Sequence, residues 1–97
     1  MTTPAIQANQ SVITSVPSAI GTTQLLAPNG NRANFVVYNA STAILYLSMD
    51  GAASLTHYTV QVPAQGYFEH PAGAVYTGMV TGVWSAANGN ALVTELS

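Results

Sequence analysis

The residues that decide the fold are 32–51, RANFVVYNASTAILYLSMDG. Two runs in this stretch, FVVY and ILYL, consist of β-branched, aromatic and other large apolar residues, which favour strands. The residues NAST separate the two runs and are typical of a turn, and Asp50-Gly51 is a second turn signal after them. The stretch therefore predicts two strands, over 32–39 and 43–49.

Similar patterns occur on both sides of this stretch. Strands are predicted over 22–27, 57–62, 67–70, 77–85 and 91–96, in segments bounded by turn-forming residues. Asn88-Gly89 stands between the last two, and this dipeptide between strand-like runs predicts a β-hairpin. No segment keeps apolar residues at helical spacing over three turns. We therefore expect an all-β chain, either a small antiparallel β-sandwich or a jelly-roll-like barrel.

Residues 1–20 carry no charge and are rich in Thr, Ser, Ala, Gln and Asn. Pro4 and Pro17 disfavour a helix there, and a weak alternation predicts one strand at about 11–16. We expect an extended N-terminal arm over 1–20, followed by a β-sandwich domain over 21–97. Such an arm is suited to lie along a neighbouring molecule as an added strand, with Val12 and Ile13 at the contact.

The chain has 97 residues but only four charged side chains, Arg32, Asp50, Glu69 and Glu95. A soluble domain of this length usually carries about 24. Nucleic-acid binding and attachment to anionic membranes both need several Lys or Arg residues, so we expect neither partner. The lack of cysteine excludes disulfides and Cys-based zinc sites. The chain has no run of 18 apolar residues and no signal-peptide pattern, so we expect one small domain made without export.

Several predicted strands are apolar on both faces, since Phe35 and Val37 alternate with Val36 and Tyr38. In a two-layer sandwich only one face of each sheet meets the core, so the second face needs another cover. The scarcity of charge is a second reason to expect surface that other subunits cover. The candidate interface residues are Val12, Ile13, Arg32, Tyr38, Tyr46 and Glu69.

Arg32 is the only cation of the chain and follows a turn. We expect it to be either a solvated turn residue or one partner of an interface ion pair. The carboxylate of that pair would come from Glu69, from Glu95 or from another molecule.

Residues that could support catalysis are few, namely His57, His70, Asp50, Glu69 and Glu95, together with hydroxyl groups. The chain has no G-x-S-x-G nucleophile motif. Glu69 and His70 are sequence neighbours and would point to opposite faces of a strand, which disfavours a shared metal site. We therefore expect no enzymatic activity, no metal and no cofactor.

From residue 25 onward the chain contains a series of short motifs: LLAPN, FVVYNAS, LYL, YTV, GYFE, YTG, GVW and LVTEL. With these motifs, the chain resembles small β-sandwich virion proteins of tailed bacteriophages. The likeness covers roughly residues 24–97. It implies a β-sandwich that sits on or in the particle.

In function, the resemblance implies a capsid decoration or cement protein that binds the major capsid protein at the capsid surface of the virion as a homotrimer. A tail, collar or fibre-associated component of the virion is the first alternative. A carbohydrate-binding β-sandwich module that uses Tyr67, Tyr76 or Trp84 is the second.

Overall fold

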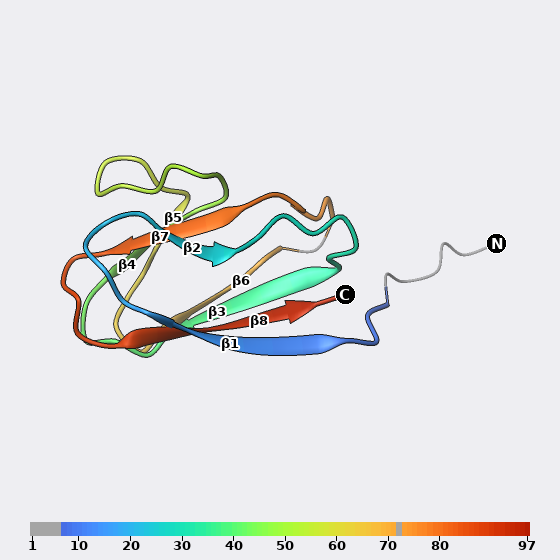
Figure 1. Cartoon of the computed structure of the whole chain (residues 1–97), viewed down its shortest axis with the longest axis horizontal. Helices are drawn as coiled ribbons and strands as arrows, with labels where there is room; N and C mark the ends of the chain where they lie inside the picture. The colour runs from blue at the N-terminus through green and yellow to red at the C-terminus, as the bar shows by residue number, and fades with distance from the viewer. Residues whose placement is uncertain (1–6, 72) are drawn as a thin grey trace.

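A computed structural model describes residues 7–71 and 73–97 of the chain. Within these residues eight strands form two four-stranded antiparallel sheets that pack as a β-sandwich (Figure 1), so the predicted all-β fold is confirmed. We call the sheet with strand order β1-β8-β3-β6 sheet I and the sheet with order β2-β7-β4-β5 sheet II. No helix in this part of the chain could span a membrane. The strands are β1 (Ser11–Pro17), β2 (Thr23–Leu26), β3 (Asn34–Asn39), β4 (Leu45–Ser48), β5 (Val60–Val62), β6 (Tyr67–Glu69), β7 (Val80–Trp84) and β8 (Asn90–Leu96).

The chain passes from one sheet to the other at almost every connection. Among the described strands, only β4 and β5 follow each other in the sequence and also pair. The hairpin predicted at Asn88-Gly89 is therefore wrong, because β7 lies in sheet II and β8 in sheet I. Gly89 is needed in this link between the sheets, since a Cβ atom there would lie 2.6 Å from Cα of Ser41. Turn chemistry marks where a strand ends but does not specify its partner strand.

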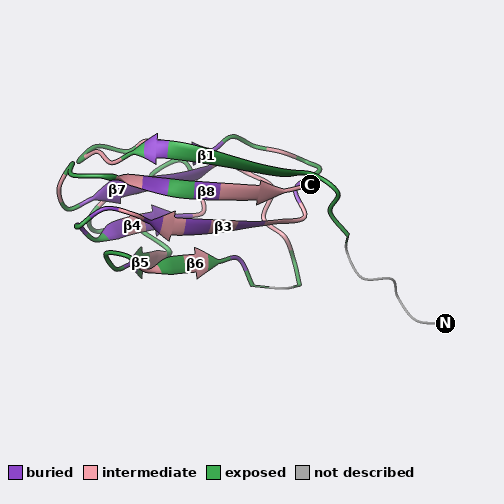
Figure 2. Cartoon of the chain, turned by 90° about the horizontal axis from the view of Figure 1, so that it is seen from below, coloured by how far each residue is buried: buried purple, intermediate pink, exposed green. Residues whose placement is uncertain are grey.

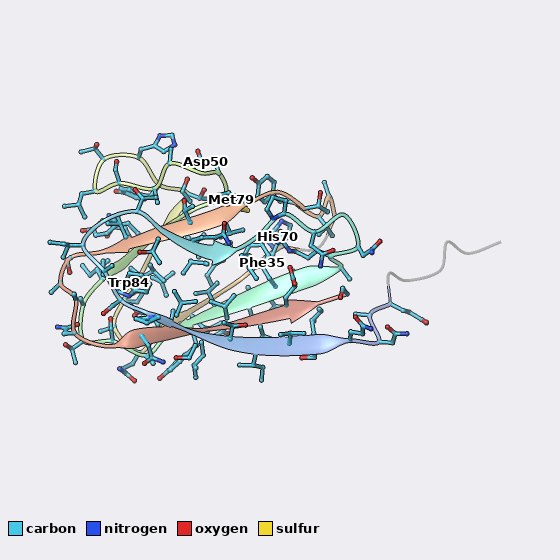
Figure 3. The ribbon with its side chains drawn as sticks, in the orientation of Figure 1. Phe35, Asp50, His70, Met79 and Trp84 are labelled. Atoms are coloured by element: carbon cyan, nitrogen blue, oxygen red, sulfur yellow. The ribbon has the colours of Figure 1, made fainter. Side chains whose placement is uncertain are left out.

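The core lies between the inner faces of the two sheets. Phe35 and Val37 from β3, Leu45 and Leu47 from β4, and Trp84 from β7 belong to one apolar cluster, and each is at most 1% exposed. Figure 3 shows Phe35 and Trp84 between the sheets. Along β3, buried and half-buried residues alternate, as the period of two in a strand requires.

Asn39, the last residue of β3, is a fully buried polar residue that joins several strands. Its Nδ2 donates to the carbonyl oxygens of Ala43 and Val62 at 2.7 and 3.0 Å. Its Oδ1 accepts hydrogen bonds from Nε1 of Trp84 at 3.2 Å and from Oγ of Ser41 at 2.7 Å. The side chain thus satisfies polar groups at the point where the chain crosses from sheet I to sheet II, in a place that water does not reach.

The strand predicted at about 11–16 is present as β1, but it belongs to the domain and not to a separate arm. It pairs along its whole length with β8, from Ser11 opposite Leu96 to Pro17 opposite Asn90. Val16 reaches the core and is 8% exposed. The predicted domain boundary at residue 20 therefore does not separate β1 from the sandwich. The local sequence could not show this, because pairing with β8 depends on residues at the other end of the chain. Residues 1–6 of the predicted arm lie outside the described residues.

Residues 49–59, which connect β4 to β5, lie over the outer face of sheet II (Figure 1). Oγ1 of Thr81 in β7 donates to the carbonyl of Asp50 at 2.8 Å and accepts a bond from the amide of Ala53 at 3.1 Å. Val83 also points to this outer face, yet it is only 3% exposed. The chain therefore covers part of the outer face of sheet II itself, at Thr81 and Val83, without another subunit.

Candidate functional site

The outer face of sheet I is open. In Figure 2 no described segment crosses in front of β1, β8, β3 and β6. Residues that are direct partners across antiparallel strands point to the same face, so the register identifies the side chains on it. We call this surface the open face. Two of its rows, read from β1 to β6, are Ile13, Thr94, Val36, Glu69 and Ser15, Leu92, Tyr38, Tyr67.

The open face carries a patch of exposed apolar and aromatic side chains. Ile13 is 67% exposed, Tyr67 68% and Leu92 39%. Tyr38 is half-buried between Leu92 and Tyr67, and its hydroxyl donates to Oε1 of Gln65 at 2.8 Å. Single exposed apolar residues are common on soluble proteins, but several on one sheet face are typical of a contact surface.

A hollow of about 500 Å³ opens at one end of this sheet. Asn34 and Leu96, which are direct partners in the next row of the open face, form part of its lining. The hollow therefore continues the open face toward Pro71, Gly73 and Val75. Its full lining is Ala8, Ala33, Asn34, Pro71, Gly73, Val75 and Leu96, without a charged side chain.

Arg32 is not on this surface, nor is it a solvated turn residue, because its side chain is completely buried in its own chain. Nε donates to Glu95 Oε2 at 2.9 Å, which makes an ion pair within the molecule. Nη1 donates to the carbonyl oxygens of Tyr76 and Gly78, both at 2.9 Å, and Nη2 donates to that of Ala27 at 2.7 Å. The guanidinium group therefore connects two loops to β8, and its complete burial keeps it from the carboxylate of a partner molecule.

Asp50 and His57 form a second side-chain contact between titratable residues, in the 49–59 connection. His57 Nε2 lies 2.7 Å from Asp50 Oδ2, and both side chains are exposed. The Ser48 hydroxyl, which donates to Asp50 Oδ1, lowers the pKa of that carboxyl to about 2, with further contributions from His57 and the Ala52 amide. Ser48 and His57 both bind the carboxylate and not each other, so the three residues do not form a nucleophile–base pair.

His70 is buried and both of its ring nitrogens have backbone partners. Nδ1 lies 2.7 Å from the carbonyl oxygen of Pro71, and Nε2 accepts a hydrogen bond from the amide of Tyr76 at 3.2 Å. The ring also packs against Phe35 at a centroid distance of 5.3 Å. Within residues 7–71 and 73–97, no group of three or more His, Cys, Asp or Glu side chains is placed to hold a metal ion.

The structure brings three of the six predicted interface residues together and separates the other three. Ile13, Tyr38 and Glu69 share the open face. Val12 points to the opposite side of β1, although it is 56% exposed. Tyr46 lies on sheet II, where its ring packs edge-on against that of Tyr58, with 5.1 Å between the ring centroids.

Two residues of the open face were missed as interface candidates. Leu92 was not singled out, and Tyr67 was considered only for sugar binding. A period-of-two reading of 67–69 and 90–96 would have placed both on the face away from the core.

Of the three aromatic residues considered for sugar binding, only Tyr67 is largely exposed. Trp84 is 1% exposed and donates its indole N–H to Asn39. Tyr76 is half-buried, and its hydroxyl donates to the carbonyl of Met79 at 2.9 Å. An aromatic sugar platform of several rings is therefore not formed by these residues.

Charge is scarce on the open face. Glu69 is the only charged side chain in the rows that the register defines. Comparison with protein-family models, curated proteins and solved structures found no match to this chain. The open face is accordingly the feature from which a function can be argued.

Proposed function

We propose that the chain is a structural protein of a tailed-bacteriophage particle, which decorates the capsid and stabilises it as a cement protein. The observation that carries this proposal is the open face, which presents Ile13, Leu92 and Tyr67 beside a single charged side chain, Glu69. The resemblance of residues 24–97 to small virion β-sandwich proteins is the reason to expect that this contact is made on a phage particle. The partner is the major capsid protein, and the place is the outer surface of the head.

The chemistry of the contact follows from the few charges. Arg32, Glu95 and Asp50 are paired within the chain, so they offer little to a partner. Burial of apolar area, worth about 25 cal/mol per Å², and neutral hydrogen bonds would hold the protein on the shell. Several copies that bind neighbouring capsid subunits gain further by effective concentration. Salt screens charge pairs but not apolar burial, so retention on particles is expected to be insensitive to salt.

The test uses virions purified from the phage that, under this proposal, encodes the chain. The double variant Tyr67→Ser/Leu92→Ser removes exposed apolar groups from the open face without touching the core. Leu55→Ser is the matched control, because Leu55 is 55% exposed in the connection that covers the other sheet. We expect fewer copies per particle and DNA release at a lower temperature for the double variant only. Unchanged copy number in the double variant, or absence of the protein from virions, would refute the proposal.

A position on the tail, collar or fibre would use the same kind of surface. Labelled protein spread over the whole head supports decoration, whereas label at a single vertex or along the tail assigns the alternative position. Glycan binding that is lost in Tyr67→Ser, with copies on the head unchanged, would instead favour a carbohydrate-binding module.

A further inference from the structure

The free edge of β1 is the longest strand edge in the described part of the molecule. The edge strands of the two sheets are β1 and β6, and β2 and β5. β1 has seven residues, whereas β2 has four and β5 and β6 have three each. Short edge strands are one way in which proteins avoid pairing with other chains, and β1 lacks that protection.

The register with β8 identifies which backbone groups of β1 point outward. Gln10 and Ser97 exchange amide-to-carbonyl bonds of 2.9 and 3.0 Å, and the Ser18 amide donates to the Gly89 carbonyl at 2.9 Å. Since hydrogen-bonded residues alternate along an antiparallel pair, the even-numbered residues 10–18 face β8. The N–H and C=O groups of Ser11, Ile13 and Ser15 therefore point away from the sheet and are available to another strand.

The side chains of β1 do not prevent another strand from pairing at this edge. The strand Ser11–Pro17 contains no charged residue. Val12 and Ile13, on opposite faces of the strand, are 56% and 67% exposed. Pro17 is the only residue without an N–H, and it stands at the strand's end. An added extended strand would satisfy the outward backbone groups and shield both apolar side chains.

The sequence of the strand points to its own copy as the partner. Residues 11–15, Ser-Val-Ile-Thr-Ser, are nearly the same in shape when read in either direction, because Val and Thr are both β-branched and of similar size. In an antiparallel pair of two β1 strands centred on Ile13, Ile13 faces Ile13 of the second copy. Ser11 then faces Ser15, and Val12 faces Thr14. All of these pairs are neutral, and the outward groups of Ser11, Ile13 and Ser15 form the hydrogen bonds.

We propose that two copies of this chain associate through their β1 strands about a twofold axis at Ile13. The two four-stranded sheets I would then become one continuous sheet of eight strands. Their open faces would join into one surface on the same side. This inference does not depend on the proposed function, and it departs from the trimer that the resemblance implies.

The test compares the mass in solution of the wild-type chain with that of three variants, by light scattering after size exclusion over a range of concentrations. Ile13→Lys and Ile13→Glu place like charges opposite each other across the twofold axis, which destabilises strand pairing. Ile20→Lys is the matched control, because Ile20 is 73% exposed and lies outside the strand. Near-ultraviolet circular dichroism of Trp84, which is buried, reports whether each variant is folded.

We expect a wild-type dimer, a dimer of unchanged affinity for Ile20→Lys, and monomers for Ile13→Lys and Ile13→Glu. An equimolar mixture of the last two is expected to recover the dimer, because opposite charges then meet at the axis. Ser15→Pro removes one outward N–H and keeps the backbone bonds to β8, although it loses the bond from Nδ2 of Asn90 to the Ser15 hydroxyl. This variant should also weaken the dimer, by about tenfold or more. A wild-type monomer or trimer, an Ile13→Lys variant that remains dimeric, or a mixture that remains monomeric would overturn the proposal.

Discussion

Replacement of Arg32 by leucine is expected to lower the free energy of unfolding by about 3–5 kcal/mol, the range measured when one partner of a buried ion pair is removed. The side chain is completely buried and makes four hydrogen bonds of 2.7–2.9 Å. The variant leaves Glu95 without its cation and three backbone carbonyl groups without a donor. A chain of this length has a total stability of about 5–15 kcal/mol, so the loss is a large share of it.

Urea denaturation followed by Trp84 fluorescence measures this loss, because Trp84 is the only tryptophan and is buried. With a slope of about 1–3 kcal/mol per M, the midpoint is expected to fall by at least about 1 M. Glu95→Leu in the Arg32→Leu background should cost less than in the wild type, with a coupling of about 1–3 kcal/mol. A loss below about 1 kcal/mol, or strictly additive losses, would refute the assigned role of the pair.

Arg32 is also the only trypsin site, and cleavage there requires opening of the fold. With a stability of about 5 kcal/mol, digestion of the folded chain should be more than about a thousandfold slower than digestion of the unfolded chain. Rapid cleavage of the folded chain on a gel would contradict this expectation. Asn39→Ala leaves the buried Trp84 N–H without its acceptor, and a loss of about 2–4 kcal/mol is expected by urea denaturation; a neutral effect would show that the network around residue 39 is dispensable. The bonds from the Ser48 hydroxyl and His57 lower the pKa of the Asp50 carboxyl to about 2 in the folded chain, from its ordinary value of 3.8. Its contribution to stability is therefore complete above about pH 4 and is lost as the pH falls through about 2. NMR titration of the Asp50 carboxyl carbon should show this low midpoint, and a midpoint near 3.8 would mean that the bonds to the Ser48 hydroxyl and to His57 do not persist in solution.

Much of the local structure could be predicted from the sequence. All eight expected strands are present, with bounds that shift by at most three residues, because alternation and turn residues act over only a few positions. The errors concern partners. Asn88-Gly89 joins two sheets and not two paired strands, and β1 pairs with β8 instead of extending from the domain. Both outcomes depend on residues that lie far apart in the chain.

The open face was predicted in part. Ile13 and Tyr38 were selected for apolar character and Glu69 for its charge, and the register places the three residues on one surface. Tyr46 met the same criteria, but the 49–59 connection lies over its sheet and provides a packing partner in Tyr58. Whether a loop covers an apolar sheet face depends on its path in three dimensions, which no short pattern records.

The sequence by itself determined the all-β character, the positions of the strands and the scarcity of charge, since each depends on residue type and on near neighbours. The tertiary structure alone decided which strands pair, which sheet face stays open and where the few charges lie. Arg32 illustrates the difference, because its carboxylate partner is 63 residues away and its burial depends on the loops that close around it. Such contacts form only when distant segments meet, so local patterns carry no record of them.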